Sequence, residues 1–166
     1  MALNLPKMVN IFKHSRETGE GFSKEKKTVK ELLLFPNESS VSPSRYNHWA
    51  IVDLSATGHC NWNIKLPDDF TAIETLSIVV IPDDTEDITG DVDASIAKVG
   101  QNFENTTVQL AAVGDSVVEN VLHEIDISRI ITGGLTQLAS AGDYLGIWFN
   151  SNTSNWRIIG LKFKYT

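Results

Sequence analysis

The sequence predicts an all-β fold, an antiparallel β-sandwich of jelly-roll type, on three observations. Apolar and polar residues alternate with a period of two in most segments after residue 29. Clusters of Gly, Pro, Asn, Asp and Ser separate these segments and are typical of turns. About eight or nine such segments follow one another at spacings of roughly 10–15 residues, with no long amphipathic helical pattern between them, as in antiparallel sandwiches.

The first expected strand is residues 30–35 (KELLLF), which Pro36 ends. The further expected strands are residues 47–55, 62–67, 73–82, 92–100, 106–114, 117–127, 143–149 and 156–166. Residues 83–91 are expected to form an acidic turn, and residues 127–143 are the one segment expected to be helical or irregular. Because a polar turn over residues 150–155 joins the last two strands, we expect these strands to form a hairpin.

Alternation also assigns faces, since successive side chains of a strand point to opposite sides of a sheet. Trp148, Trp156 and Ile158 are expected on the outer side, together with Tyr144. The inward set comprises Trp62, Leu76, Ile78, Val80, Leu145, Ile147, Phe149, Ile159, Leu161, Phe163 and Tyr165.

The chain of 166 residues fits one domain with its own core. We expect residues 30–166 to be the sandwich domain and residues 1–29 to be an extended N-terminal arm. Residues 1–30 hold seven Lys or Arg and three Glu, a net charge of about +4. The remainder holds seven Lys or Arg and eighteen Asp or Glu, a net charge of about −11. The arm could contact a phosphate backbone or the acidic flank of a neighbouring subunit, or be a solvated tail.

Composition excludes several classes of protein. No stretch reaches the roughly 18 apolar residues of a membrane-spanning helix, so no membrane partner is expected. The N-terminus lacks the apolar region of a secretory signal, and a single cysteine fits synthesis in a reducing cytoplasm. An acidic body repels phosphates, which argues against nucleic acid as a partner.

No motif of a known catalytic site occurs, so we expect a protein that is not an enzyme and has no catalytic residue or cofactor. Cys60 lacks a nucleophile signature and is expected to be a small apolar residue, and His59 beside it would point to the opposite face. Four carboxylates lie close together in the sequence and could be neutralised by Ca²⁺: Asp83, Asp84, Glu86 and Asp87. Their spacing does not match a calcium-binding loop, so a solvated acidic loop is favoured.

The four tryptophans, Trp49, Trp62, Trp148 and Trp156, allow two interpretations. Exposed aromatic faces can stack on sugar rings or pack against another subunit. Core or subunit packing is favoured, and a platform for surface glycans is the alternative.

The order of segments in residues 46–166 resembles small virion structural proteins of tailed bacteriophages. The residues that carry the resemblance are LPDDF after a Trp-containing strand, then LSIVVIPDD, GDYLGIWF and the closing IIGLKFKYT. The resemblance implies a jelly-roll or related sandwich, often trimeric, on a capsid, neck or tail fibre. It implies no catalytic set.

We therefore expect a non-enzymatic virion protein that is made in the host cytoplasm and acts by symmetric self-assembly. It would be a capsid decoration, head-fibre or tail-associated subunit, most simply a homotrimer docked on partners such as the major capsid protein. A carbohydrate-binding or receptor-binding module that uses exposed tryptophans is the alternative. The residues expected at interfaces are Phe12, Phe22, Lys24, Lys26 and Lys27 in the arm and Tyr144, Trp148, Trp156 and Ile158 in the body.

Overall fold

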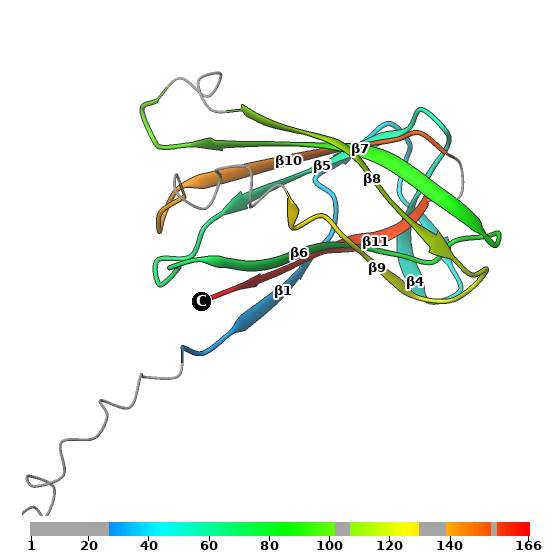
Figure 1. The fold of residues 1–166 in the computed structure, drawn as a ribbon, viewed down its shortest axis with the longest axis horizontal. Coiled ribbons are helices and arrows are strands. Elements are labelled where there is room, and N and C mark those ends of the chain that lie inside the picture. Colours follow the sequence, from blue (N-terminus) through cyan, green and yellow to red (C-terminus); the bar gives the residue numbers. More distant parts are fainter. Residues whose placement is uncertain (1–26, 102–106, 130–138, 154–155) are drawn as a thin grey trace, which may run out of the picture.

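The structure is a computed structural model that describes residues 27–101, 107–129, 139–153 and 156–166. In this part of the chain, eleven strands form two antiparallel sheets. The two sheets lie one above the other as separate layers (Figure 1). The predicted all-β sandwich is confirmed.

The first layer, sheet A, contains in spatial order β3 (Ser44–Tyr46), β4 (Trp49–Leu54), β11 (Trp156–Tyr165), β6 (Ile73–Val80) and β9 (His123–Asp126). Strand β1 (Lys30–Leu34) pairs with the C-terminal half of β11. The second layer, sheet B, contains in spatial order β2 (Glu38–Ser39), β5 (His59–Lys65), β10 (Tyr144–Ser151), β7 (Glu86–Ala97) and β8 (Thr107–Val117).

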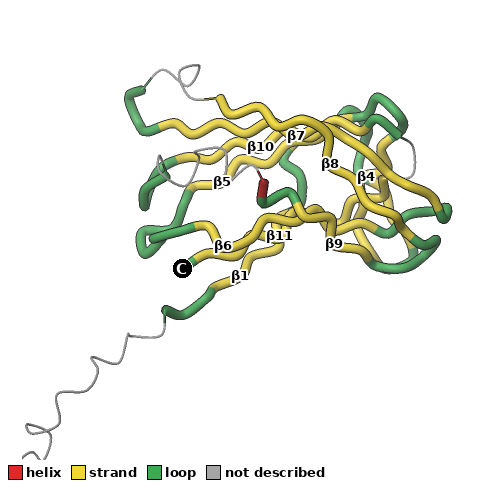
Figure 2. The backbone as a smooth tube through the Cα atoms, viewed as in Figure 1, coloured by secondary structure: helices red, strands yellow, loops and turns green. Residues whose placement is uncertain are grey.

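The strand order is that of a jelly roll. The four strands β4-β11-β6-β9 of sheet A face the four strands β5-β10-β7-β8 of sheet B. Among these eight strands, β7 and β8 are the only neighbours in sequence that are also hydrogen-bonded to each other. Each of the remaining steps between these eight strands crosses from one layer to the other, as can be followed along the tube in Figure 2.

The predicted hairpin of the last two strands is wrong, because β10 and β11 lie in different sheets. Strand β10 pairs with β5 and β7, whereas β11 pairs with β1, β4 and β6, so they are the central strands of opposite sheets. Both strands bury one complete face, and the rings of Phe149 and Trp156 meet with centroids 4.5 Å apart. A turn of suitable length and polarity therefore joins two layers here rather than two neighbours.

The core between the layers follows the predicted alternation closely. Trp62 is fully buried, and its indole N–H donates to the Leu34 carbonyl at 3.0 Å, which satisfies its polar group. The other residues predicted to face inward and found in this core are Leu76, Ile78, Val80, Leu145, Ile147, Phe149, Leu161, Phe163 and Tyr165.

A β-bulge in β11 overturns the predicted faces of three residues. Ile158 lies opposite Val80 and Gly160 lies opposite Val79, so β11 has one residue more than β6 at this point. Such an extra residue reverses the in-and-out phase of a strand. Trp156 and Ile158 are consequently fully buried in the core, where the alternation had placed them outside.

Ile159, predicted to face the core, belongs instead to a small cluster on the outer side of sheet A. This cluster consists of Ile51, Val79, Ile81 and Ile159, and Tyr46 of β3 packs against it. The bulge thus lets β11 contribute apolar side chains to two separate clusters.

Two boundaries also differ from the prediction. Strand β7 begins at Glu86, so most of the expected acidic turn is part of a strand. Strand β9 begins at His123, and the residues between it and β8 form a loop. The expected irregular segment lies largely in residues 130–138, outside the described residues. Among the residues that are described, no helix is long and apolar enough to cross a membrane.

Candidate functional site

The outer face of sheet B carries side chains in cross-strand rows over its central strands β5, β10 and β7. Trp148 of β10 lies between Asn61 of β5 and Asp93 of β7. In the next row, Gly146 lies between Asn63 and Ser95. These two rows line a shallow groove that is open to solvent. We call the five side chains Asn61, Asn63, Asp93, Ser95 and Trp148, with Gly146 as the floor, the sheet B groove.

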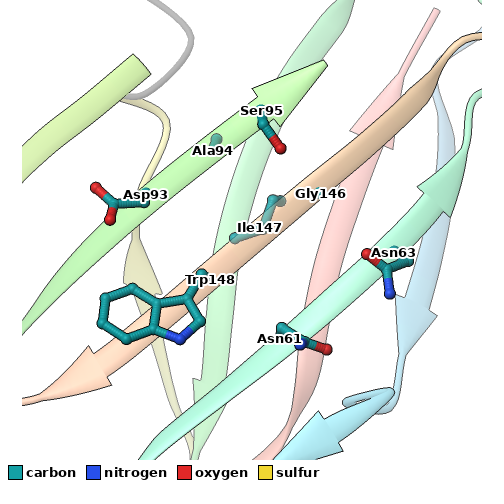
Figure 3. Close-up of a pocket in the computed structure, with 8 residues that line it drawn as sticks. All are labelled: Asn61, Asn63, Asp93, Ala94, Ser95, Gly146, Ile147 and Trp148. Atoms are coloured by element: carbon teal, nitrogen blue, oxygen red, sulfur yellow. The ribbon is translucent and has the colours of Figure 1, made fainter. Parts of the chain in front are cut away.

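Gly146 makes the groove possible because it places no side chain on the outer face. A Cβ atom at this position would lie 3.1 Å from the Ser95 hydroxyl oxygen and 3.7 Å from Asn63 Oδ1. Figure 3 shows Gly146 between these two side chains, on the same face as Trp148. Glycine inside a strand often marks a point where another molecule or backbone approaches closely.

The aromatic wall of the groove is Trp148, whose side chain is 38% exposed. Its ring contacts the His59 ring, with the centroids 6.1 Å apart and the planes tilted by 32°. Tyr144, also exposed, lies on the same face of β10 four residues earlier. The strand rise puts these two aromatic residues about 13 Å apart, on either side of Gly146.

Most polar groups of the groove have no hydrogen-bond partner in the described part of the protein. The side chains of Asn63, Asp93 and Ser95 and the indole N–H of Trp148 make none there. Asn61 donates from Nδ2 to Glu38 Oε2 at 3.3 Å, but its Oδ1 atom is buried and accepts no hydrogen bond from the described residues. Of these groups only Asn61 Oδ1 is buried, and a buried polar atom without a partner is uncommon and calls for a specific explanation, whereas the others are open to water.

The charge of this face is negative. Asp91 and Asp93 lie two residues apart on β7, Glu38 borders Asn61, and Lys65 stands at the far end of β5. Partial burial raises the pKa of Asp93 above its ordinary value of 3.8, and the neighbouring carboxylate of Asp91 raises it further. Ionised Asp93 is therefore kept on this face at some energetic disadvantage.

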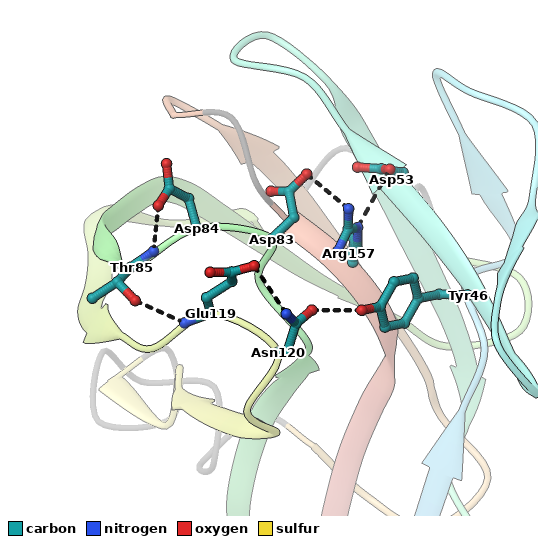
Figure 4. A network of polar contacts seen from close by, with 8 residues as sticks. All are labelled: Tyr46, Asp53, Asp83, Asp84, Thr85, Glu119, Asn120 and Arg157. Carbon is teal, nitrogen blue, oxygen red and sulfur yellow. Dashed lines mark hydrogen bonds and ion pairs between the residues drawn. The ribbon is translucent and has the colours of Figure 1, made fainter.

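The corresponding polar network on sheet A differs, because most of its groups contact one another, although Asp83 Oδ1 is buried and accepts no hydrogen bond from the described residues. The Arg157 guanidinium contacts Asp83 Oδ2 at 2.9 Å and Asp53 Oδ2 at 3.7 Å, and lies 4.5 Å from the centre of the Tyr46 ring. Burial raises the pKa of Asp53, although the Arg157 charge partly opposes this. Figure 4 shows Arg157 between the two carboxylates, and a chain of hydrogen bonds that leads from Tyr46 through Asn120 and Glu119 to Thr85.

The four candidate calcium ligands do not converge. Asp83 pairs with Arg157, Asp84 accepts from the Thr85 backbone N–H at 2.8 Å, and Asp87 accepts from the Ser116 hydroxyl at 2.5 Å. Glu86 lies at the start of β7. Among the residues described, no group of three or more His, Cys, Asp or Glu side chains could hold a metal ion.

The predicted interface residues fall into three groups. Tyr144 and Trp148 are exposed as expected. Trp156 and Ile158 are buried in the core, so their predicted place at an interface is wrong. Lys27 is exposed, and its Nζ lies 3.5 Å from Thr71 Oγ1. Phe12, Phe22, Lys24 and Lys26 lie outside the described residues, as does most of the predicted arm.

Cys60 is fully buried, and burial raises the pKa of its thiol. Its side chain points into the core while His59 lies on the outer face, as the alternation predicts. His123 accepts a hydrogen bond at Nε2 from the Val118 backbone N–H at 3.0 Å. These positions do not form a thiol–imidazole pair.

A second notable surface runs along β1. Leu33 is 55% exposed, and Val29, Leu32 and Phe35 are also exposed. In the described part of the chain, β1 pairs with β11 and with no other strand, so its second edge is open. We call these four side chains the β1 apolar edge.

Sequence reasoning missed the polar members of the sheet B groove. Asn61, Asn63, Asp93 and Ser95 come from two strands that only the pairing with β10 brings together. The one available signal was Gly146, a strand glycine between two outward aromatic residues.

No protein-family model matches the chain, and no curated protein is similar to it in sequence. Among solved structures, the exo-β-1,3-galactanase of Phanerochaete chrysosporium, determined with galactose, has a TM-score of 0.44 and 14% sequence identity. The alignment covers 84% of this chain and 30% of the galactanase. A likeness this distant carries no information about what the present chain does.

Proposed function

We propose that this chain is a non-enzymatic structural subunit of a phage particle, a capsid decoration, head-fibre or tail-associated protein. It acts by symmetric self-assembly, with a homotrimer as the expected state, and by docking on virion proteins such as the major capsid protein. The observation that carries the proposal is the β1 apolar edge.

An open edge strand with apolar side chains favours association. Edge strands present unpaired backbone groups, and soluble monomers usually protect them with charges, proline or a covering segment. The segment that carries the β1 apolar edge has two charged residues, Lys30 and Glu31, and is followed by Pro36, yet it exposes four large apolar side chains within seven residues, 29–35. By alternation Leu33 points to the outer face with Val29 and Phe35, and Leu32 points to the other face. Exposed apolar side chains gathered in this way often mark a protein–protein contact.

Two further features agree with assembly. The jelly roll is a recurrent fold of viral capsid domains, although it also occurs in lectins and cupins. The charge of about +4 on residues 1–30 and about −11 on the remainder would attract the N-terminal segment of one copy to the body of the next. This N-terminal segment leads directly into β1.

The test is the solution mass of the full chain by light scattering. We expect a trimer or larger closed ring, which a Leu33→Ser/Phe35→Ser variant converts to monomer, because apolar area is lost from the contact. Val99→Ser is the matched control, since Val99 is 86% exposed and lies in the loop after β7. Its mass should not change.

A wild-type chain that stays monomeric at high concentration would remove the proposal, as would an oligomer that the double variant leaves intact. Binding of the wild-type chain to purified phage capsids, lost in the double variant, would extend the result from self-assembly to the particle.

A further inference from the structure

We infer that the sheet B groove binds a neutral oligosaccharide, with a sugar ring stacked on Trp148 and the chain running over Gly146 toward Tyr144. This binding activity is separate from the assembly surface proposed at β1.

The groove combines the two kinds of group that sugar recognition needs. A pyranose ring has an apolar C–H face, which packs on an exposed indole such as that of Trp148. Its hydroxyl groups both donate and accept, and the carboxylate of Asp93 and the amides of Asn61 and Asn63 are planar groups that can contact two neighbouring hydroxyls. Binding sites generally consist of an apolar surface with a few placed polar groups of this kind.

The unpaired polar atoms provide an independent argument. Asn61 Oδ1 is buried without a partner in the described part of the chain, and a hydroxyl donor that enters beside it would relieve this deficit after a small rotation of the amide. The side chains of Asn63, Asp93 and Ser95, which have no hydrogen-bond partner among the described residues, surround the same floor. A ligand rich in hydroxyl groups satisfies this set better than an apolar peptide face would.

The charge of the face selects among sugars. Glu38, Asp91 and Asp93 are opposed by Lys65 alone among the lysines and arginines on the outward positions of β5, β7 and β10. This arrangement repels sialylated, sulfated and phosphorylated glycans. The ligand class is therefore neutral.

The shape of the groove selects a chain over a single ring. The groove is shallow and open to solvent, and Trp148 and Tyr144 lie about 13 Å apart on the same face of β10. One ring on Trp148 would leave Tyr144 uncovered, whereas a short oligosaccharide reaches both. Gly146 between them lets the intervening ring approach the backbone.

The experiment is a glycan array probed with the full wild-type chain. The array carries neutral gluco-, galacto- and N-acetylglucosamine oligosaccharides, with sialylated and sulfated glycans beside them. We expect binding to neutral oligosaccharides, weakened about tenfold or more in Trp148→Ala, because the stacking surface is removed.

Two variants complete the design. Gly146→Val fills the floor and should abolish binding, and the nearest groups to its Cβ are flexible side chains, so the fold should tolerate it. Trp49→Ala is the matched control, because Trp49 is 50% exposed but lies on β4 in sheet A. It should bind as the wild type does, and thermal unfolding of each variant checks that the body is intact.

Absence of binding to any neutral glycan overturns the inference, as does binding confined to acidic glycans. Binding that survives Trp148→Ala, or that Trp49→Ala removes, overturns it as well. If the wild-type chain binds no glycan and Trp148→Ala lowers the mass of the assembly, the groove is a contact between copies of this chain.

Discussion

Strands β10 and β11 are the central strands of the two sheets, and their outer faces differ in how polar groups are satisfied. On β11, Arg157 is shared by Asp53 and Asp83, while Lys162 contacts both carboxylate oxygens of Glu124 at 2.6 and 2.7 Å. On β10, Trp148 and Gly146 border side chains that make few internal contacts. Most outer side chains around β11 are held by one another, with Asp83 Oδ1 as the exception, and so support the fold. Most of those around β10 are open to solvent and are therefore accessible to a partner.

The difference extends to the two tryptophans on these strands. Trp156 is fully buried and its indole N–H contacts Thr153 Oγ1 at 3.3 Å, while Trp148 lies on the open face. The residue type is the same, and the role is set by the phase of the strand.

The largest expected effect comes from Trp156→Ala. Removing this ring from between Phe149 and the rest of the core should lower the free energy of unfolding by about 3–5 kcal/mol. Trp148→Ala should lower it by less than about 1 kcal/mol, because its ring is partly solvated. Urea unfolding followed by circular dichroism measures both.

Equal losses for the two variants would contradict the buried position of Trp156. They would mean that the bulge in β11 is absent in solution, and that Trp156 shares an exposed position with Trp148 as simple alternation suggests.

The next effect in size is that of Arg157→Ala. Its side chain is 18% exposed and serves two carboxylates and the Tyr46 ring, so its loss should lower the free energy of unfolding by about 1–3 kcal/mol. Arg157→Lys should recover only part of this, because an ammonium group lacks the planar fork that spans two acceptors. Urea unfolding at low and high salt tests both variants.

A loss for Arg157→Ala no larger than that of an ordinary surface variant would show that the outer face of sheet A is no more fixed than that of sheet B. That result would contradict the stabilising role assigned to the outer side chains of β11.

The smallest expected effect is that of Asp93→Asn on sheet B. The native protein holds the Asp93 proton more tightly than the unfolded chain, so ionisation lowers stability as the pH rises through the raised pKa. At pH 7 the variant should be more stable than the wild type by less than about 0.5 kcal/mol. Below the ordinary pKa of 3.8 this gain should vanish.

Urea titrations at pH 7 and pH 3 make the measurement, with Asp84→Asn as a control on an exposed loop. A variant that is less stable than the wild type at pH 7 would mean that Asp93 has a stabilising partner.

Alternation predicted the parts of this structure that depend on a regular strand. The faces of β5, β6 and β10, and with them the outward positions of Tyr144 and Trp148, are as expected. Period-two alternation determines faces reliably as long as the backbone keeps its phase.

Two features of the structure could not be predicted from the alternation of apolar and polar residues. The bulge at Ile159 has no signature in the apolar pattern, because an apolar residue occupies each position from Ile158 to Leu161 except Gly160. The partners of β10 depend on the whole topology rather than on the turn that follows it, so the hairpin was predicted wrongly and the residues across from Gly146 were not identified.

The position of β11 also has a consequence for how fast this protein folds. Strand β11 pairs Tyr165 with Lys30 and Leu161 with Ile78, so sheet A is held together by contacts between distant parts of the chain. Loop closure must precede these contacts, and folds dominated by them form on the order of milliseconds to seconds. Until β11 inserts, β1, β4 and β6 have no central strand, and the chain is most exposed to aggregation during that interval.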